Sequence, residues 1–366
     1  MRYLFFFVHP SKFHVFKHTI NRLKRDGHDV EVLITSKDIL EQLVKNEGWD
    51  YTNIFPEGRK MDGVPAYVSS TINLFRTIYR LYNYCKGKKY DLFITDDLLV
   101  YIGKLQRVPT IVFTDDDLST TKQFSIVLAF ADYILSPDIT DLAKYNKKKI
   151  SFSGYKELAY LHPDIFRPNK DIIRQFNPKM DTYFLLRLVS MRSYHDTGKK
   201  GLSDRNVWRL IELLEYYGKV FISAERKLPT DMEKYRLKLK SELIAHAIFY
   251  ADLFIGDSQT MTSEAVVLGT PAFRCNDFVG NINVMDEKEN KYGLSFNYKP
   301  ENFEKMYERI KTMLNEKRFK DTFQSKRNVM LAEKINLTGF MIWLLENYPD
   351  SVEEIRQDPQ IQYRFL

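Results

Sequence analysis

The sequence predicts an α/β protein made of two Rossmann-like domains in tandem, each with a parallel sheet. The chain has 366 residues, and at about 150 residues per domain this length is enough for two domains. Short apolar runs alternate with helix-length segments from the first residues onward, which is typical of βα units. The alternation starts again after residues 164–181, a stretch rich in Pro, Asn and charged residues that we interpret as a domain boundary.

In the first half, the run Tyr3–Val8 predicts a buried strand. The segment Phe13–Arg25 predicts a helix, because its apolar residues recur on one face. Gly27 suits the position just after that helix, where the backbone often turns left-handed. Further strands are expected at Val30–Ile34, Asp91–Thr95, Thr110–Thr114, Tyr133–Leu135 and Ile150–Ser153.

In the second half, the same pattern predicts a second set of strands and helices. The expected strands are Tyr183–Val189, Val220–Ser223, Leu253–Gly256 and Pro271–Arg274. The expected helices are Asn206–Tyr217, Ser241–Tyr250, one from about Thr260, and then Phe303–Leu314, Phe319–Asn328 and Ile335–Glu346. Ligands of such sheets bind beyond the carboxyl ends of the strands, so the residues that follow each strand are the first candidates for function.

Composition excludes several classes of protein. The 55 basic and 48 acidic residues give a net charge of +7, which fits a phosphate-bearing ligand, a nucleic acid or an anionic membrane surface. Cys85 and Cys275 are too few for a disulfide scaffold and indicate a reducing compartment. The chain has no Cys/His cluster for zinc, no nucleic-acid-binding signature and no apolar run of about 18 residues for a membrane span. The first apolar run is also too short for a signal peptide, so we expect a cytoplasmic protein.

The strongest local signal is the segment Gly256–Ala265, in which a strand leads into a helix. Ser258 is a good N-cap, and the N–H groups that follow it can bind an anion. Glu264 would repel a phosphate, so a functional role for it is to accept hydrogen bonds from sugar hydroxyls. The alternative is a plain N-cap with an acidic residue favoured by the helix dipole.

The loop after Tyr183–Val189 combines small residues with cations, among them Arg192 and Lys199. Such a loop suits a diphosphate, because fixed donors offset its charge. Arg187 lies inside the strand, where an arginine is costly unless it is paired or contacts a ligand. The alternative is a solvated basic loop.

The first strand ends in His9-Pro10, and His14 follows within the next helix. No Gly-rich GxGxxG motif is present, which argues against a dinucleotide site. Histidine titrates near neutrality, so both residues are candidates for a general base or a binding role. A structural histidine at a strand end is the alternative.

Two acidic clusters follow later strands, Asp96-Asp97 and Asp115-Asp116-Asp117. The second contains the letters of a DxD metal motif, but a solvated turn or a helix cap also explains it, and we expect no metal site. The lysine runs at residues 86–89 and 147–149 are interpreted as solvated loops that could also rest on anionic lipid.

Several longer motifs resemble a prokaryotic family known only as a domain of unknown function. They are His9-Pro10 with Phe13–Lys17, Gly27–Val30, Gly154–Pro163, Phe221–Glu225 and Gly256–Pro271, and together they extend over nearly the whole chain. Members of that family look like two-domain GT-B proteins related to glycosyltransferases and UDP-N-acetylglucosamine 2-epimerases.

The resemblance implies a GT-B fold: two Rossmann-like domains facing a cleft, with the C-terminal helix packing back on the N-terminal domain. We expect an N-terminal domain at 1–165 on the acceptor side, a C-terminal domain at 166–340 on the nucleotide-sugar side, and a helical tail at 341–366. It also implies that Ser258, Gln259 and Thr260 contact the phosphates and Glu264 the ribose. The full expected nucleotide-binding set is Arg187, Arg192, Lys199, Glu225, Ser258, Gln259, Thr260 and Glu264.

The resemblance to 2-epimerases implies a different use of the same fold. Asp96, Asp115 or Asp116, and His195 would then be the acid and base groups around the sugar. Two features depart from the epimerase pattern: Gln259-Thr260 replaces the paired glycines after the serine, and the loop after His195 differs. The expected catalytic set is His9, His14, Asp96, Asp116 and His195.

The leading hypothesis is a metal-independent glycosyltransferase that uses a nucleotide sugar, UDP-linked, to build a cell-surface polysaccharide or glycolipid. Its partners would be that donor and a sugar or lipid-linked acceptor, with no nucleic acid, no separate cofactor and a peripheral contact with the inner face of the membrane. One alternative is a nucleotide-sugar 2-epimerase, which could be hydrolysing. The other is a non-catalytic binding protein on a GT-B scaffold.

Overall fold

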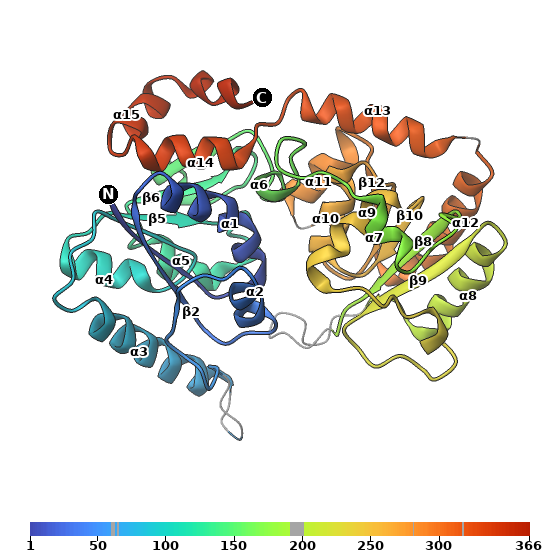
Figure 1. The fold of residues 1–366 in the computed structure, drawn as a ribbon, viewed down its shortest axis with the longest axis horizontal. Coiled ribbons are helices and arrows are strands. Elements are labelled where there is room, and N and C mark those ends of the chain that lie inside the picture. The colour runs from blue at the N-terminus through green and yellow to red at the C-terminus, as the bar shows by residue number, and fades with distance from the viewer. Residues whose placement is uncertain (60–62, 64–65, 191–200, 281, 317) are drawn as a thin grey trace. The chain divides into compact units, whose positions relative to one another are not determined.

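The computed structural model describes residues 1–59, 63, 66–190, 201–280, 282–316 and 318–366. They form two compact units (Figure 1). Unit 1 consists of Met1–Tyr160 together with Lys334–Leu366, and unit 2 consists of Leu161–Glu333. The sequence had suggested boundaries at 165 and 340.

Within the described residues, unit 1 has a seven-stranded parallel sheet in the order β3-β2-β1-β4-β5-β6-β7. The chain runs outward from β1 to β3 and then returns to β4 beside β1, so the switch in direction lies between β1 and β4. The strands are β1 (Arg2–Phe7), β2 (Asp29–Ile34), β3 (Thr52–Asn53), β4 (Leu92–Thr95), β5 (Thr110–Phe113), β6 (Tyr133–Pro137) and β7 (Lys149–Phe152).

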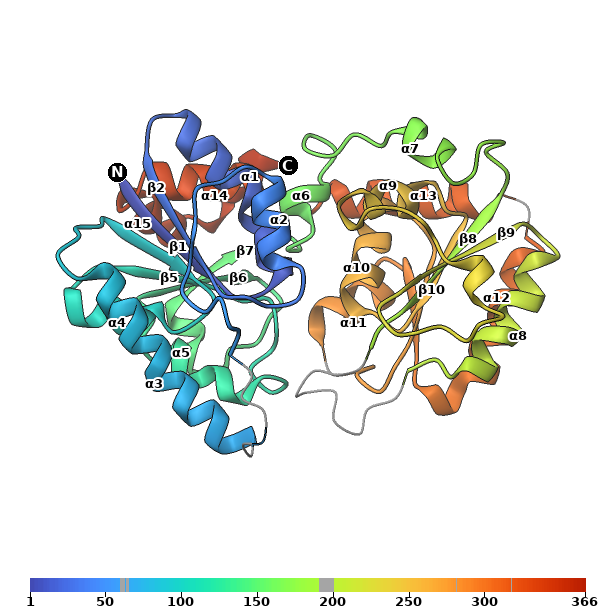
Figure 2. The ribbon, with the colours of Figure 1, turned by 60° about the horizontal axis from the view of Figure 1, so that its bottom comes forward.

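Helices cover both faces of this sheet, which is why β1 is apolar at successive positions. Phe5 and Phe7 pack against Phe16 of the first helix, with ring centroids 5.5 and 5.9 Å apart. Leu4 and Phe6 point the other way, into a buried cluster with residues of the third, fourth and fifth helices. Figure 2 shows α3, α4 and α5 on one side of the sheet and α1 and α2 on the other. The helices are α1 (Pro10–Arg25), α2 (Leu40–Asn46), α3 (Ala66–Cys85), α4 (Leu99–Gln106), α5 (Ser125–Leu128) and α6 (Leu158–Leu161).

The C-terminal segment completes unit 1. Helix α14 (Leu337–Glu346) packs on α1, and α15 (Asp350–Gln357) follows it. The phenol of Tyr3 donates to the carbonyl of Leu345 at 2.8 Å, and Thr338 Oγ1 donates to the carbonyl of Ala159 at 2.6 Å. The expectation that the C-terminal helix packs back on the N-terminal domain is therefore confirmed.

Unit 2 has a parallel sheet of five strands in its described part, in the order β12-β11-β10-β8-β9. Its switch point lies between β8 and β10. The strands are β8 (Tyr183–Leu188), β9 (Lys219–Ala224), β10 (Leu253–Gly256), β11 (Ala272–Cys275) and β12 (Ser295–Tyr298). The helices are α7 (Lys170–Arg174), α8 (Asp204–Glu215), α9 (Ile244–Tyr250), α10 (Gln259–Leu268), α11 (Asn283–Asn290), α12 (Phe303–Leu314) and α13 (Phe319–Leu331).

The two-domain α/β fold predicted from the alternating pattern is confirmed, although the pattern missed several elements. β3 has only two residues, which is too short for a period to be seen. Helix α11 has the sequence NVMDEKEN, and because most of these residues are polar, the sequence does not indicate which face is buried. The helix expected at 241–250 begins with a 3₁₀ turn at Ser241–Leu243 and becomes α9 only at Ile244.

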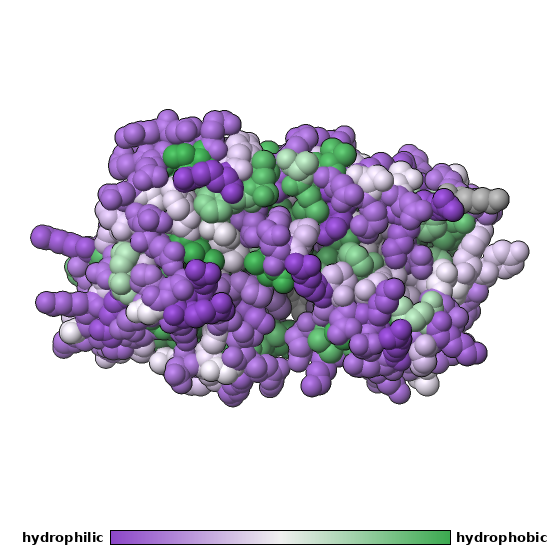
Figure 3. All heavy atoms as spheres, turned by 45° about the horizontal axis from the view of Figure 1, so that its top comes forward, coloured by the Kyte–Doolittle hydropathy of each residue, from purple (hydrophilic) through white to green (hydrophobic). Residues whose placement is uncertain are grey.

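The surface face drawn in Figure 3 is mostly hydrophilic, with apolar side chains in scattered spots. Among the described residues, no helix combines the length and the apolar character needed to cross a bilayer.

Candidate functional site

The switch point of unit 1 joins the ends of β1 and β4 through a buried carboxylate. The backbone N–H of Val8 donates to Oδ1 of Asp96 at 3.2 Å. Burial raises the pKa of Asp96 to about 7. Both protonation states are therefore populated near neutrality, which is the property that a general acid or base needs.

A second carboxylate at this sheet edge is held between two lysines. Asp115, the second residue after β5, lies 3.1 Å from Nζ of Lys12 and 2.6 Å from Nζ of Lys156. All three side chains are largely buried. Burial alone would raise the pKa of Asp115, but the two ammonium groups hold it well below its usual range. Burial would likewise lower the pKa of Lys156, but the charge of Asp115 raises it overall. The pair therefore stays ionised.

Sequence reasoning did not select Lys12 or Lys156, although each had a signal. Lys12 lies in the first turn of α1, which follows β1, and Lys156 lies four residues after the end of β7. Both therefore belong to the edge where the carboxyl ends of the parallel strands meet.

The three aspartates after β5 have different environments. Asp116 is half-buried, and within the described part of the chain its carboxylate accepts no hydrogen bond. Burial, and then the charge of Asp115, raise the pKa of Asp116. Asp117 instead accepts a hydrogen bond from the backbone N–H of Asp141 at 2.7 Å, which fixes the loop. No group of His, Cys, Asp and Glu in the described residues could hold a metal ion.

His9 is the N-cap of α1. Its Nδ1 accepts from the backbone N–H of Ser11 at 3.2 Å and lies 2.9 Å from the Ser11 hydroxyl. Burial, and then the charges of Lys37 and Lys12, lower the pKa of His9 to about 3. The imidazole is therefore neutral at physiological pH. With Nδ1 used as an acceptor, Nε2 is left as a hydrogen-bond donor.

His14 lies farther along α1 and packs among aromatic rings. Its ring centroid is 5.2 Å from that of Tyr160 and 5.3 Å from that of Phe13. Burial, and then the charge of Lys17, lower the pKa of His14 to about 4. The structure thus gives His14 a packing role, and its catalytic role stays a prediction.

In unit 2 the corresponding edge begins with the helix α10. Ser258 caps this helix, and its Oγ accepts from the backbone N–H of Met261 at 3.3 Å. Gln259 and Thr260 form the first turn and are half-buried. The N–H groups of a first helical turn lack partners within the helix, so this turn can bind an anion.

Asp257, just before the cap, repeats the arrangement of Asp96. Its Oδ1 accepts from the backbone N–H of Val189 at 2.8 Å, which links the end of β10 to the end of β8. Burial raises the pKa of Asp257 to about 6. Its carbonyl also accepts from Nδ2 of Asn276 at 2.8 Å. Sequence reasoning had assigned no role to Asp257.

Two of the predicted nucleotide-binding residues are in contact. Arg187, on β8, forms an ion pair with Glu225 and donates from Nη1 to the hydroxyl of Ser223 at 2.8 Å. Glu225 also accepts from the backbone N–H of Ser190 at 3.4 Å. The arginine inside a strand is therefore paired within the chain.

A second arginine lies on the other side of β10. In the strand register Gly256 pairs with Arg187 of β8 and with Arg274 of β11. Arg274 is fully buried, and none of its three guanidinium nitrogens has a hydrogen-bond partner among the described residues. Burial lowers the pKa of Arg274 to about 10, so it stays cationic at neutral pH. Sequence reasoning missed it, because neither its burial nor its lack of partners is visible in a strand pattern.

The remaining predicted residues are placed as follows. Glu264 is buried in the middle of α10. Arg192, His195 and Lys199 lie outside the described residues, so their expected roles remain predictions.

The chain belongs to the family described as "Protein of unknown function (DUF354)", whose model matches residues 8–287. No curated protein matches the sequence significantly. Solved structures match in fold. One is the UDP-GlcNAc 2-epimerase of Methanocaldococcus jannaschii in complex with UDP-GlcNAc and UDP, with a TM-score of 0.61 at 15% identity, covering 87% of this chain and 94% of that chain.

Two further solved structures resemble the fold of this chain to a similar degree. The UDP-GlcNAc 2-epimerase of Neisseria meningitidis bound to UDP-GlcNAc has a TM-score of 0.63 at 14% identity, covering 95% of this chain and 100% of that one. CalG4, the calicheamicin glycosyltransferase, has a TM-score of 0.58 at 10% identity, covering 95% and 98%. These likenesses show that the chain has the GT-B fold that the sequence predicted.

Proposed function

We propose that this protein is a glycosyltransferase of GT-B type that takes its sugar from a nucleotide diphosphate donor, UDP-linked, and transfers it to a sugar or lipid-linked acceptor. Such a reaction builds cell-surface polysaccharide or glycolipid. The observation that carries the proposal is the start of α10, a capped helix N-terminus at the switch point of unit 2 that has a buried arginine on the neighbouring strand β11.

Unit 2 is proposed to bind the donor. The first-turn N–H groups of Gln259 and Thr260 would contact the phosphates, while Arg274 adds fixed positive charge on β11 beside β10, and Arg187 on β8 would contact the donor together with its partner Glu225. As the bond to the sugar breaks, negative charge develops on the leaving diphosphate, and these fixed dipoles and charges stabilise it. Glu264 would accept hydrogen bonds from the ribose. The chain's own groups thus offset the phosphate charge, and the mechanism invokes no cofactor.

Unit 1 is proposed to bind the acceptor and to move its proton. Asp96 has a pKa matched to neutral pH and can accept a proton from an acceptor hydroxyl. Lys12 and Lys156, which form ion pairs with Asp115, provide ordered charged groups beside Asp96. Nε2 of His9 can donate a hydrogen bond to an acceptor oxygen.

A 2-epimerase is the second candidate, and one observation favours it. Asp96 and Asp116 both have pKa values raised by burial, and removal and return of a proton at a sugar carbon needs two such acid and base groups. Two of the structures of similar fold are epimerases in complex with UDP-GlcNAc.

One experiment separates these functions. The protein is incubated in deuterium oxide with UDP-linked sugars, with and without candidate acceptors, and the products are followed by mass spectrometry and phosphorus NMR. Release of UDP only in the presence of an acceptor, without deuterium in the recovered sugar, is the result that a transferase predicts. Deuterium in the sugar without an acceptor supports the epimerase instead. Binding of UDP without any turnover supports the non-catalytic alternative.

A further inference from the structure

The outer face of helices α3, α4 and α5 in unit 1 carries exposed apolar side chains. Phe75, Tyr79 and Leu105 have exposed fractions of 65%, 66% and 65%. On α3 the exposed residues recur at 72, 75, 79 and 82, a spacing that places them in one stripe along the helix. The opposite side of α3, with Leu81 and Cys85, is buried in the core. Ile126 and Phe130 extend the exposed set to the region of α5.

The same face is basic. No Asp or Glu occurs in the sequence of α3, α4 or α5, or of the 3₁₀ turns Lys122–Phe124 and Ala143–Lys148 beside them. These elements instead carry Lys122, Lys144, Lys147 and Lys148, together with three cations that are paired within unit 1: Arg76 and Arg80 with Glu57, and Lys104 with Asp132.

Further cations lie where α3 and α4 end. Nε2 of Gln106 donates to the carbonyl of Cys85 at 3.2 Å, which holds the two helix ends together. Lys86, Lys89 and Arg107, which follow these ends, are exposed, and within the described ranges none of them forms an ion pair. Their charges are therefore available to a partner.

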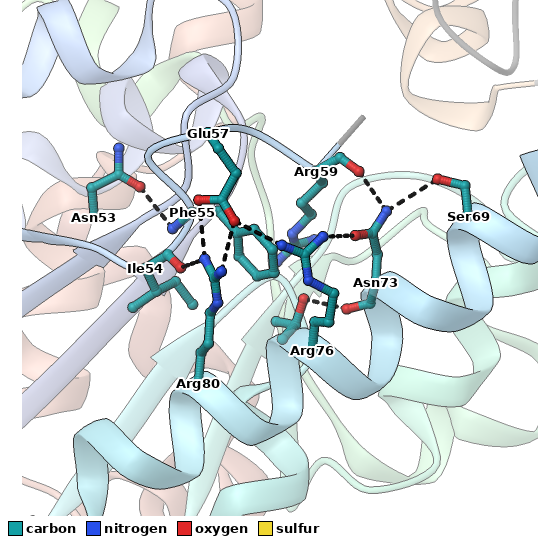
Figure 4. A network of polar contacts seen from close by, with 10 residues as sticks. Asn53, Ile54, Phe55, Glu57, Arg59, Ser69, Asn73, Arg76 and Arg80 are labelled. Carbon is teal, nitrogen blue, oxygen red and sulfur yellow. Dashed lines mark hydrogen bonds and ion pairs between the residues drawn. The ribbon is translucent and has the colours of Figure 1, made fainter. Parts of the chain in front are cut away.

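The orientation of α3 is fixed from its inner side. Arg76 and Arg80 both bond to Glu57 and stack on the ring of Phe55, with guanidinium carbons 5.1 and 4.1 Å from the ring centroid (Figure 4). Arg80 also donates to the carbonyl of Ile54 at 2.6 Å. These contacts hold the helix so that its aromatic stripe faces solvent, and they use the charge of Glu57 internally.

The C-terminal helices do not cover this face in the described part of unit 1, because α14 packs on α1, on the other side of the sheet (Figure 2). An aromatic and aliphatic stripe is therefore exposed beside cations that have no ion-pair partner in the described part of the chain. Phe and Tyr side chains favour the interface between headgroups and acyl chains, and each Lys or Arg near an anionic bilayer adds attraction.

We propose that the α3–α5 face of unit 1 binds the surface of an anionic lipid bilayer. A second copy of the chain fits this face poorly. In a two-fold contact the same patch meets itself, so its cations would face like charges with no acidic residue on these helices to offset them. The inference goes beyond the proposed enzymatic function and does not depend on it.

The test is co-sedimentation of the full-length protein with vesicles. Vesicles of phosphatidylcholine and phosphatidylglycerol are expected to bind the protein, and vesicles of phosphatidylcholine alone to bind it much less. The double variant Lys86→Glu, Lys89→Glu should weaken binding about thirtyfold or more, because each cation near an anionic surface strengthens binding about fivefold. Phe75→Ser with Tyr79→Ser should also weaken binding, and in that variant the residual binding should fall more steeply with added salt.

A matched control is Lys238→Glu with Lys240→Glu, which changes the net charge equally on exposed lysines of unit 2. This control should bind as the wild type does. The proposal would be overturned if the control lost as much vesicle binding as the Lys86→Glu, Lys89→Glu variant. It would also be overturned if the wild type bound both kinds of vesicle equally. A wild-type dimer in sedimentation velocity that the Phe75→Ser, Tyr79→Ser variant converts to a monomer would overturn it as well. Since Lys86 and Lys89 are exposed and form no ion pair with the residues that the structure describes, their variant tests the proposal even if the aromatic variant does not fold.

Discussion

At the scale of single residues, the two units use the same device at their switch points. In unit 1, the buried Asp96 after β4 accepts a hydrogen bond from the backbone N–H of Val8, which follows β1. In unit 2, the buried Asp257 after β10 accepts one from the backbone N–H of Val189, which follows β8. Burial raises the pKa of these carboxyls to about 7 and about 6. Each loop is thereby fixed next to the groups proposed to act on substrate.

The raised pKa of Asp96 predicts a pH-dependent stability. In the unfolded chain this carboxyl loses its proton near its ordinary pKa of 3.8, whereas the folded protein keeps the proton up to about pH 7. The contribution of this group to stability is therefore lost as the pH rises from about 4 to about 7. Asp96→Asn removes that loss and should gain stability relative to wild type over this range, on the order of 4 kcal/mol.

Urea unfolding of both proteins at pH 4.5 and pH 8 checks this prediction. If the free energy of unfolding differs between variant and wild type by the same amount at both pH values, the assigned burial of Asp96 is contradicted. In the assay of activity the same variant should lose about 10²–10⁴-fold in turnover if Asp96 moves a proton.

At the scale of elements, the beginning of α10 carries the proposed donor site, and α8 supplies a control. Both helices have a serine N-cap whose Oγ accepts from the backbone N–H three residues later, Ser258 at 3.3 Å and Ser203 at 3.2 Å. Ser258→Ala and Ser203→Ala should each lower the unfolding free energy by about 1 kcal/mol. Only Ser258→Ala should weaken nucleotide binding in calorimetric titration. Equal effects of both variants on affinity would rule out a special role for α10.

The close approach of β10 to β8 requires a glycine at position 256. A Cβ there would lie 2.8 Å from the carbonyl oxygen and 2.9 Å from the Cβ of Arg187. Gly256→Ala should therefore force the strands apart and lower stability by about 1–3 kcal/mol. Gly154→Ala is the control, because its Cβ would meet atoms no closer than 3.4 Å. Thermal unfolding of both variants measures the difference in stability, and equal melting temperatures would contradict the requirement for glycine at position 256.

At the scale of the whole molecule, the chain returns to unit 1 at its end. Helix α14 buries five large apolar side chains, Leu337, Phe340, Met341, Leu344 and Leu345. At about 2 kcal/mol each, their burial contributes roughly 10 kcal/mol, which is comparable to the entire stability of an ordinary domain.

Removal of residues 334–366 should therefore unfold unit 1. We expect the truncated chain to express as insoluble protein, or to show loss of helical signal and of cooperative melting for about half of its structure. A truncated chain that remains soluble and melts as the full-length protein does would show that α14 is dispensable.

The fold could be predicted from the sequence to a large extent, because strand periodicity and helix periodicity are local. Runs such as Tyr3–Phe7 and Leu253–Gly256 are apolar at successive positions, as strands covered on both faces are. The residues of the candidate site were harder to predict from the sequence. The pairing of Asp115 with Lys12 and Lys156 joins residues distant in the chain, and only packing reveals that Arg274 is buried with no hydrogen-bond partner among the described residues. His9 had the right residue type for catalysis, but its cap bond and low pKa depend on the turn into α1.

The central claim is that unit 2 binds a nucleotide diphosphate at the start of α10, and one measurement tests it most directly. The melting temperature of the protein is recorded with UDP, GDP, CDP, CMP, TDP and their sugar conjugates, for the wild type and for Glu264→Ala. A ligand that binds only the folded state raises the melting temperature. We predict a shift with UDP or its conjugates that Glu264→Ala abolishes while the variant alone melts as the wild type does. No shift with any of these nucleotides, or a shift that Glu264→Ala leaves unchanged, would contradict the account.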